Sequence, residues 1–274
     1  MSRAAPLALI LAAGAGKRLG MGMAKPLLPL PSMPAGEGTF IERHLRLLAE
    51  LKVEAFAIVP GPDLDSYRFL ARDGVTLVGN PNSASSSGST VSLRVGLDAL
   101  REREAPLAKD LIIMDCDIIY ERSLLARVIE GGSRTCLFVT PSPPGDDEEV
   151  RVHGTGVTPR LVGKGLPVAM TANLENMGES VGIIRVGASD VELLCSVTSW
   201  LVGRPPANPG YGFSKQLSEH EEIWQYFCTI GRMSICRLPA AMAFSECDTK
   251  VDYQHIVANV LPRIREREGI ACST

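Results

Sequence analysis

A glycine-rich segment that carries positive charge lies near the start of the chain. It reads AAGAGKRLG over residues 12–20, and Lys25 follows five residues later. Glycines let the backbone approach a phosphate closely, and clustered N–H groups form a concavity that binds anions. Lys17, Arg18 and Lys25 add three cations, which would repel one another unless an anion neutralised them. The segment therefore predicts a phosphate site.

Two common phosphate-binding loops do not fit this segment. The dinucleotide fingerprint GxGxxG would need a glycine at Leu19, and the next apolar run, AFAIVPG, does not end in an acidic residue. The P-loop GxxxxGK[ST] fails because Met21 follows Gly20. Dehydrogenase and P-loop kinase functions are therefore excluded.

Paired carboxylates occur at two distant places. Asp115 and Asp117 follow the apolar run LIIM, and Glu246 and Asp248 have the same spacing near the C-terminus. Residues two apart on an extended segment share a face. Chemistry on phosphates commonly needs a divalent ion, usually Mg²⁺, which carboxylates hold. We therefore expect Mg²⁺ as a cofactor, whereas Asp252 suits the start of a final helix.

The first segment resembles the signature of the nucleotidyltransferase family with the GT-A-like Rossmann fold. The likeness rests on Leu11-Ala12-Ala13-Gly14, on Arg18 and on Lys25-Pro26. It implies that the loop wraps a triphosphate. It also implies that Arg18 and Lys25 are the catalytic residues that stabilise charge on the phosphates.

Later segments resemble, in the same order, the phosphocholine cytidylyltransferases and the related cytidylyltransferases of phosphonate biosynthesis. The matching segments are Asn80-Pro81 with Ser92-Leu93, DIIY from Asp117, Val162-Gly163-Lys164, Glu179–Ile183 and the ECD of residues 246–248. This resemblance implies Asp117, rather than Asp115, as a metal ligand, together with Glu246 and Asp248.

The same resemblance implies CTP as the nucleotide. It places the loop over residues 83–90, SASSSGST, beside the base. Small hydroxyl residues can bond a pyrimidine edge, although a flexible surface loop has the same composition. The implied nucleotide-binding residues are Leu11, Ala12, Ala13, Gly14, Ala15, Gly16, Lys17, Arg18, Asn80, Ser87, Gly88, Ser89, Ser92 and Asp115.

The acceptor is expected to be a small anion. Arg160, Lys164 and Glu179 are the predicted substrate-binding residues, and the two cations, with Arg151, suit a phosphonate. An exposed surface lysine is the alternative for Lys164. Phosphocholine would require an aromatic or acidic cage, and aromatic residues make up only 5% of the chain.

Direct chemistry is predicted, because the four histidines form no cluster and no covalent nucleophile is evident. The acceptor's phosphoryl oxygen would attack the α-phosphate in line and release pyrophosphate, with catalysis by positioning and charge neutralisation. The alternatives are a sugar-phosphate or molybdopterin nucleotidyltransferase and a catalytically inactive, nucleotide-sensing regulatory subunit of the same fold.

Alternating elements must position these residues. Apolar runs at 7–12, 55–59 and 111–114 predict strands that are buried on both faces, and helical periods cover 40–51 and 90–103. They predict an α/β fold, a Rossmann-like, doubly wound mixed sheet of the GT-A type. We expect a single domain over residues 1–274, with a β-rich insert on the substrate side at about 141–179 and turns at Gly154, Gly156 and Gly163.

Composition limits the remaining functions. The net charge of −3 gives no broad basic surface for nucleic acid, and no apolar run is long enough for a membrane helix. Residues 1–15 imitate a secretory signal, but cleavage near Ala13 would remove the glycine loop. The seven scattered cysteines suggest buried thiols and a cytoplasmic protein. The sequence leaves the oligomeric state open and is compatible with a homodimer.

Overall fold

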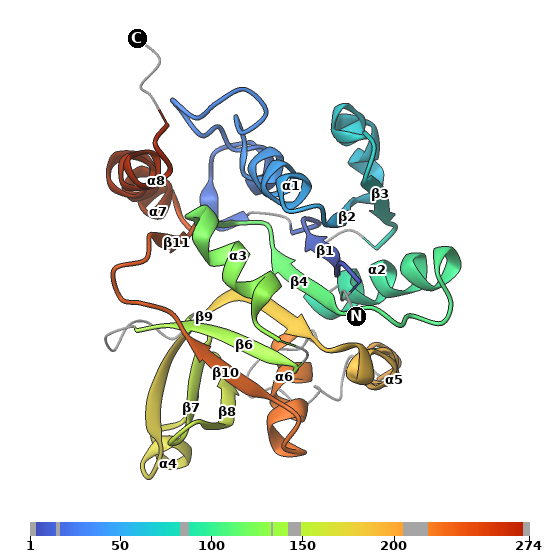
Figure 1. The fold of residues 1–274 in the computed structure, drawn as a ribbon, viewed down its shortest axis with the longest axis vertical. Coiled ribbons are helices and arrows are strands. Elements are labelled where there is room, and N and C mark those ends of the chain that lie inside the picture. Colours follow the sequence, from blue (N-terminus) through green and yellow to red (C-terminus); the bar gives the residue numbers. More distant parts are fainter. Residues whose placement is uncertain are drawn as a thin grey trace.

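A mixed nine-stranded sheet forms the centre of the protein (Figure 1). The computed structural model describes residues 4–14, 17–82, 88–132, 134–141, 149–204 and 219–270, so the predicted site residues Ala15, Gly16 and Ser87 lie outside it. Seven strands follow one another in the order β10-β6-β9-β4-β1-β2-β3. Their bounds are Leu7–Leu11 (β1), Glu54–Pro60 (β2), Val75–Asn80 (β3), Leu111–Asp115 (β4), Cys136–Thr140 (β6), Glu175–Val186 (β9) and Ser234–Arg237 (β10).

Strand direction changes at β9. Strands β3, β2, β1 and β4 are parallel, whereas β9 runs antiparallel to both β4 and β6. All five residues of β1 are buried, because side chains alternate between two packed faces. Leu9 belongs to one core cluster and Ile10 to the other. The mixed α/β fold predicted from the apolar runs is confirmed.

Helices cover both faces of the sheet (Figure 1). One core cluster packs α2, α5 and α6 against the strands, the second packs α1, α3 and a 3₁₀ helix, and a third lies under the C-terminal helix. Their bounds are Phe40–Glu50 (α1), Gly61–Leu70 (3₁₀), Ser89–Arg103 (α2), Arg122–Glu130 (α3), Val191–Val202 (α5) and Glu221–Thr229 (α6). The C-terminal helix comprises Lys250–His255 (α7), a π-helical segment Ile256–Val260 and Leu261–Glu268 (α8).

A small β-rich unit extends the sheet within the predicted insert. It consists of β7 (Arg151–Thr155), β8 (Thr158–Gly163), α4 (Val168–Thr171) and the first half of β9. Gly156 makes the turn, as predicted, with a φ of +61°. The turn predicted at Gly154 is wrong: this glycine lies inside β7, where a Cβ would come within 2.2 Å of the Thr158 carbonyl oxygen.

A two-stranded ribbon joins distant parts of the chain. Strand β5 (Ile118–Tyr120) pairs antiparallel with β11 (Phe244–Glu246), and Ile118 lies opposite Glu246. The amide of Cys247 also donates to the Asp117 carbonyl over 2.8 Å. The ribbon thus places the two carboxylate pairs of the sequence side by side.

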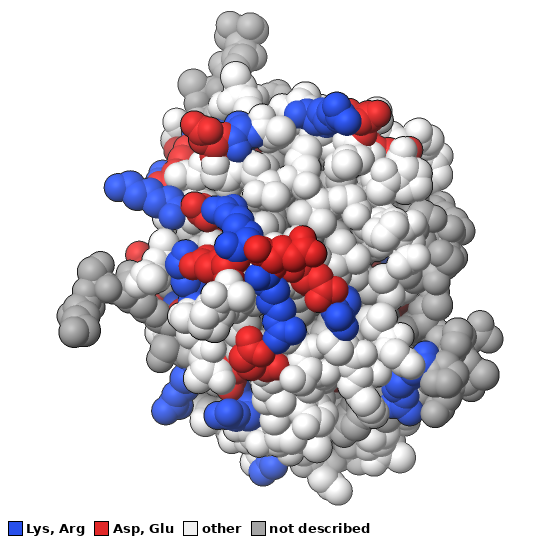
Figure 2. Space-filling model, turned by 90° about the vertical axis from the view of Figure 1, so that its right-hand side faces the viewer, with Lys and Arg blue, Asp and Glu red and all other residues white. Residues whose placement is uncertain are grey.

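The surface over α2 carries both signs of charge. Figure 2 shows acidic and basic side chains interspersed on this face. Ion pairs join Arg94 to Asp98, Arg101 to Glu192 and Arg103 to Glu54. No broad basic region is present on the face shown. In the described part of the chain, no helix has the length and apolar character needed to cross a membrane.

Cysteines contribute to the core. The six described cysteines are free thiols, and five of them are buried. Four of the five buried thiols, Cys116, Cys136, Cys195 and Cys228, belong to the two main core clusters of the sheet. This agrees with the buried thiols expected from their scattered positions.

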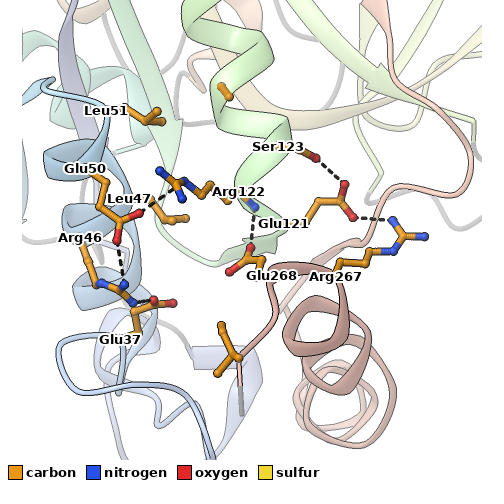
Figure 3. A pocket seen from close by; sticks show the side chains of 12 residues that line it. Glu37, Arg46, Leu47, Glu50, Leu51, Glu121, Arg122, Ser123, Arg267 and Glu268 are labelled. Carbon is orange, nitrogen blue, oxygen red and sulfur yellow. Dashed lines mark hydrogen bonds and ion pairs between the residues drawn. The ribbon is translucent and has the colours of Figure 1, made fainter.

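Charged residues tie α1 to α3 and α8. They line a pocket of about 610 Å³ (Figure 3), where Arg122 of α3 pairs with Glu50 of α1, Arg267 of α8 pairs with Glu121 before α3, and Arg46 pairs with Glu37. Behind it Arg43, only 1% exposed, pairs with Glu37 and donates to the Tyr120 carbonyl (2.9 Å) and to Glu268 Oε1 (2.6 Å). The charges of this pocket therefore compensate one another.

Replacing the buried guanidinium should be costly. Arg43→Met should lower the free energy of unfolding by about 3–5 kcal/mol, because it leaves Glu37 buried with one cation fewer. Urea unfolding measures the change. Arg68→Met is the matched control, since Arg68 and its partner Asp65 are 75% and 84% exposed. Equal losses in the two variants would contradict a stabilising role for the buried pair.

Candidate active site

Lys25 lies at the centre of the candidate site. Its Nζ is 2.7 Å from Asp117 Oδ2 and 2.7 Å from Asp248 Oδ1, and Arg18 Nη2 is 3.0 Å from the same Asp248 oxygen. Burial opposes the charge of Lys25, but the two carboxylates outweigh it and raise its pKa above the usual range. The structure thus brings the two predicted catalytic cations together with predicted metal ligands.

Three carboxylates form an oxygen-lined cluster beside Lys25. One oxygen each of Asp117, Glu246 and Asp248 lies within 4.8 Å of the others. Asp117 lies between β4 and β5, Glu246 ends β11, and Asp248 precedes the N-cap residue of α7, Thr249. These are the three residues that the sequence resemblance implies as ligands.

The electrostatics of this cluster favour a cation. Burial, followed by the charges of Asp117 and Asp248, raises the pKa of Glu246 well above its usual range. Burial also opposes ionisation of Asp248, yet bonding to Lys25 lowers its pKa. An all-oxygen donor set in which one carboxylate resists ionisation unless a further cation is present suits a hard divalent ion such as Mg²⁺. The residues present therefore fit the expected metal.

Asp115 lies next to this cluster, at the end of β4. Gly182 of β9 packs against it with a φ of +66°, and a Cβ on Gly182 would be 2.9 Å from Asp115 Oδ2. A glycine is therefore required at position 182, because the absence of a side chain leaves the space that the Asp115 carboxylate occupies.

His220 links Asp115 to the start of α2. Its Nε2 lies 3.6 Å from Asp115 Oδ2, and its Nδ1 lies 2.8 Å from the Oγ of Ser89, the first residue of α2. Burial would discharge this imidazole, but Asp115 and Glu221 outweigh that effect and raise its pKa to about 9. This role of His220 could not be predicted from the sequence, because its only charged neighbours in the chain are glutamates.

Lys164 lies on the same side of the site. Its Nζ is 3.5 Å from Glu221 Oε1, and its side chain is 19% exposed. Burial opposes its charge, but Glu221 and Glu246 outweigh it and hold the pKa of Lys164 above its usual range. The surroundings of Lys164 therefore differ from those of an exposed surface lysine.

The other predicted acceptor residues lie less centrally. Arg160 is exposed on β8, and no contact within the described residues joins its guanidinium to the carboxylate cluster. Glu179 is half-buried in β9, opposite Thr140 and Arg151 in the strand ladders. The structure thus brings only Lys164 of the three to the carboxylate cluster.

Several of the predicted nucleotide residues lie at the end of β3 and at the start of α2. Asn80 is fully buried, its Nδ2 donates to Ser92 Oγ (3.0 Å), and its Oδ1 accepts from the Asn82 amide (3.0 Å). These bonds fix where the loop between β3 and α2 begins, while Gly88 is the N-cap of α2. At the end of β1 and directly after it, Leu11, Ala12 and Ala13 are buried and Gly14 is exposed.

A family model identifies the chain. Residues 8–182 match the model described as MobA-like NTP transferase domain. The chain belongs to this family. It is therefore a nucleotidyltransferase by family, as the glycine loop and Lys25 predict, whereas a comparison with curated proteins finds no match.

Solved structures share the fold over nearly the whole chain. The inositol-1-phosphate CTP transferase from T. maritima superposes with a TM-score of 0.67 at 17% identity, covering 99% of this chain and 100% of its own. A putative glucose-1-phosphate thymidylyltransferase from Bacillus anthracis gives 0.67 at 16% (94% and 96% covered). The CTP:phosphocholine cytidylyltransferase from Streptococcus pneumoniae gives 0.62 at 17% (93% and 98% covered). At these identities the likeness shows the fold alone.

The raised pKa of His220 predicts a pH-dependent contribution to stability. Folding favours its protonated form, so the contribution is complete below about pH 6.5 and is lost as the pH rises through about 9. The difference in unfolding free energy between the wild type and His220→Gln should therefore shrink over that range. Urea unfolding at several pH values measures it, with the exposed His255→Gln as control. A difference that stays constant would contradict the ion pair with Asp115.

Gly182 predicts a separable effect on activity. Gly182→Ala and Gly156→Ala both place a side chain at positive φ, which costs about 1 kcal/mol of stability. Only the first meets Asp115, whereas nothing lies within 4 Å of a Cβ at Gly156. Thermal unfolding should therefore show a loss in both variants that is larger in Gly182→Ala, while pyrophosphate release from the folded protein should fall in Gly182→Ala alone. Equal activity in the two variants would argue against a role for the Asp115 position.

Proposed function

We propose that this chain is a Mg²⁺-dependent cytidylyltransferase that acts as a single domain over residues 1–274. It joins CTP to a small phosphonate or phosphate monoester and releases pyrophosphate. The observation that carries the proposal is the Lys25 ammonium, which lies between Asp117 and Asp248 and beside Arg18. Two cations that suit phosphates therefore lie directly beside three carboxylates that suit a metal ion.

The residues of this site would act on the phosphates. Arg18 and Lys25 would stabilise the negative charge that develops on the α-phosphate as the acceptor's oxygen attacks in line. A Mg²⁺ ion held by Asp117, Glu246 and Asp248 would neutralise phosphate charge and orient the triphosphate. Because Lys25 retains its proton, it would act as a fixed positive charge and would not serve as a base.

Support for CTP comes from three directions. The sequence resembles cytidylyltransferases, and two of the similar structures carry the names of a CTP transferase and a cytidylyltransferase. The small residues Gly88 and Ser89, at the start of α2, leave room for a pyrimidine edge beside Asn80 and Ser92. We therefore propose that the loop before α2 receives the cytosine.

The acceptor is proposed to bind beside Lys164. This ammonium suits a phosphonate or phosphate group and lies near both Glu221 and Glu246. Phosphocholine is a second candidate, because the carboxylates of Asp115 and Glu221 adjoin the same place and suit a cationic headgroup. Arg160, which is exposed, would contribute only if the acceptor reached β8.

Substrate panels and two substitutions test the proposal. CTP with a small phosphonate or phosphocholine should release pyrophosphate when Mg²⁺ is present. Lys25→Met and Asp117→Asn should each reduce kcat by about 100-fold or more without unfolding the protein. Lys109→Met is the matched control, since Lys109 pairs with Glu104 beyond the end of α2. Coupled detection of pyrophosphate gives the rates, and circular dichroism reports the fold.

Three outcomes would contradict parts of the proposal. Faster turnover of UTP or GTP with a sugar phosphate would refute the choice of base and acceptor. Unchanged turnover in Asp117→Asn would refute the metal site. Nucleotide binding without pyrophosphate release for any pair of substrates would favour the regulatory alternative.

A further inference from the structure

A buried histidine lies behind the turn that carries Asp115 and the proposed metal ligand Asp117. Asp115 and Asp117 extend into the site, whereas Cys116 between them packs in the core cluster that includes α1. His44 of α1 is 1% exposed, and its Nε2 lies 3.2 Å from the carbonyl oxygen of Cys116. The turn is therefore held from the side opposite the site.

The direction of the hydrogen bonds around His44 follows from chemistry. Burial lowers the pKa of His44 to about 4, so the imidazole is neutral and carries one N–H. A carbonyl oxygen can only accept, so the hydrogen must be on Nε2. Nδ1 then accepts from the Tyr120 hydroxyl over 3.0 Å, and burial keeps that hydroxyl protonated by raising its pKa.

Tyr120 connects this chain of bonds to the other carboxylates. It lies in β5, where it stands opposite Phe244 of β11, and Ile118 of the same strand stands opposite Glu246. Its ring stacks on His44 with centroids 5.4 Å apart, and its carbonyl accepts from Arg43 of α1 over 2.9 Å. Helix α1 therefore holds β5 through Tyr120, whose backbone carbonyl contacts Arg43 and whose hydroxyl contacts His44.

We propose that His44 and Tyr120 are positioning residues that set the relative placement of Asp117 and Glu246 for metal binding. The inference rests on the proposed metal site. It extends that proposal to two residues that do not touch the carboxylates and act through the backbone that carries them. His44 holds the turn before β5, and Tyr120 holds β5 itself, the strand with which β11 pairs. Both ligands thereby take their position from helix α1.

The donors and acceptors around His44 distinguish a positioning role from a general contribution to stability. Only the positioning role requires that both hydrogen bonds of His44 be retained. His44→Gln retains a donor for the Cys116 carbonyl and an acceptor for Tyr120, whereas His44→Phe retains the ring and removes both. Tyr120→Phe removes only the hydroxyl. Tyr67→Phe is its matched control, because Tyr67 is 1% exposed in the same core cluster and its hydroxyl has no hydrogen-bond partner within the described residues.

Binding of Mn²⁺ to the full-length protein without nucleotide, followed by electron paramagnetic resonance, is the test. His44→Phe should raise the dissociation constant by up to about tenfold, the lower end of the effect of losing a direct partner of a metal ligand, because His44 acts through the neighbouring Cys116 carbonyl. Tyr120→Phe should change it in the same direction, His44→Gln should restore binding toward the wild type, and Tyr67→Phe should leave it unchanged. Circular dichroism establishes that each variant is folded.

Wild-type affinity in folded His44→Phe would overturn the proposal. If that variant does not fold, Tyr120→Phe decides: unchanged affinity overturns the positioning role, and weaker binding than in Tyr67→Phe supports it. Asp117→Asn separates this inference from the proposed function. If Asp117→Asn does not weaken Mn²⁺ binding, the metal site itself is wrong; if it does and His44→Phe and Tyr120→Phe do not, only the positioning role fails.

Discussion

The placement of one ammonium group between two carboxylates is the interaction on which the site depends. Lys25 comes from the loop after β1, Asp117 from the turn after β4, and Asp248 from the segment before α7. Three carboxylates within 4.8 Å of one another would repel strongly if Lys25 and Arg18 were absent. Even with these cations, burial and the neighbouring carboxylates raise the pKa of Glu246, so full ionisation of the cluster favours a further cation.

The sheet supplies the geometry that this interaction requires. β1 and β4 are parallel neighbours, so the glycine loop and the Asp115–Asp117 turn both follow the carboxyl ends of strands at one edge. Strand β9 crosses beside them in the opposite direction, and its Gly182 yields the space for Asp115. The remaining carboxylates arrive through the short β5–β11 ribbon. Parallel strands alone would not complete the site.

Much of the fold could be predicted from the sequence because burial on both faces leaves uninterrupted apolar runs such as LALIL and LIIM. The cations Arg18 and Lys25 could be predicted because they lie close together in the chain, in and just after the glycine-rich segment that follows β1. The proximity of Asp117 to Glu246 could be inferred only from resemblance, because the three-residue strands of the ribbon leave no periodic pattern. His44 and His220 could not be predicted, because their roles come from tertiary contacts to Cys116 and Asp115.

The β5–β11 ribbon also has a consequence for synthesis of the chain. The matched family segment ends at residue 182, and Glu246 and Asp248 lie more than sixty residues beyond it. A ribosome therefore delivers strands β1 to β9, the glycine loop and Lys25 long before it delivers two of the three proposed ligands. Much of the nucleotide-binding half can therefore fold while the chain is still being made. The proposed metal site is complete only after the last part of the chain has been synthesised and β11 has paired with β5.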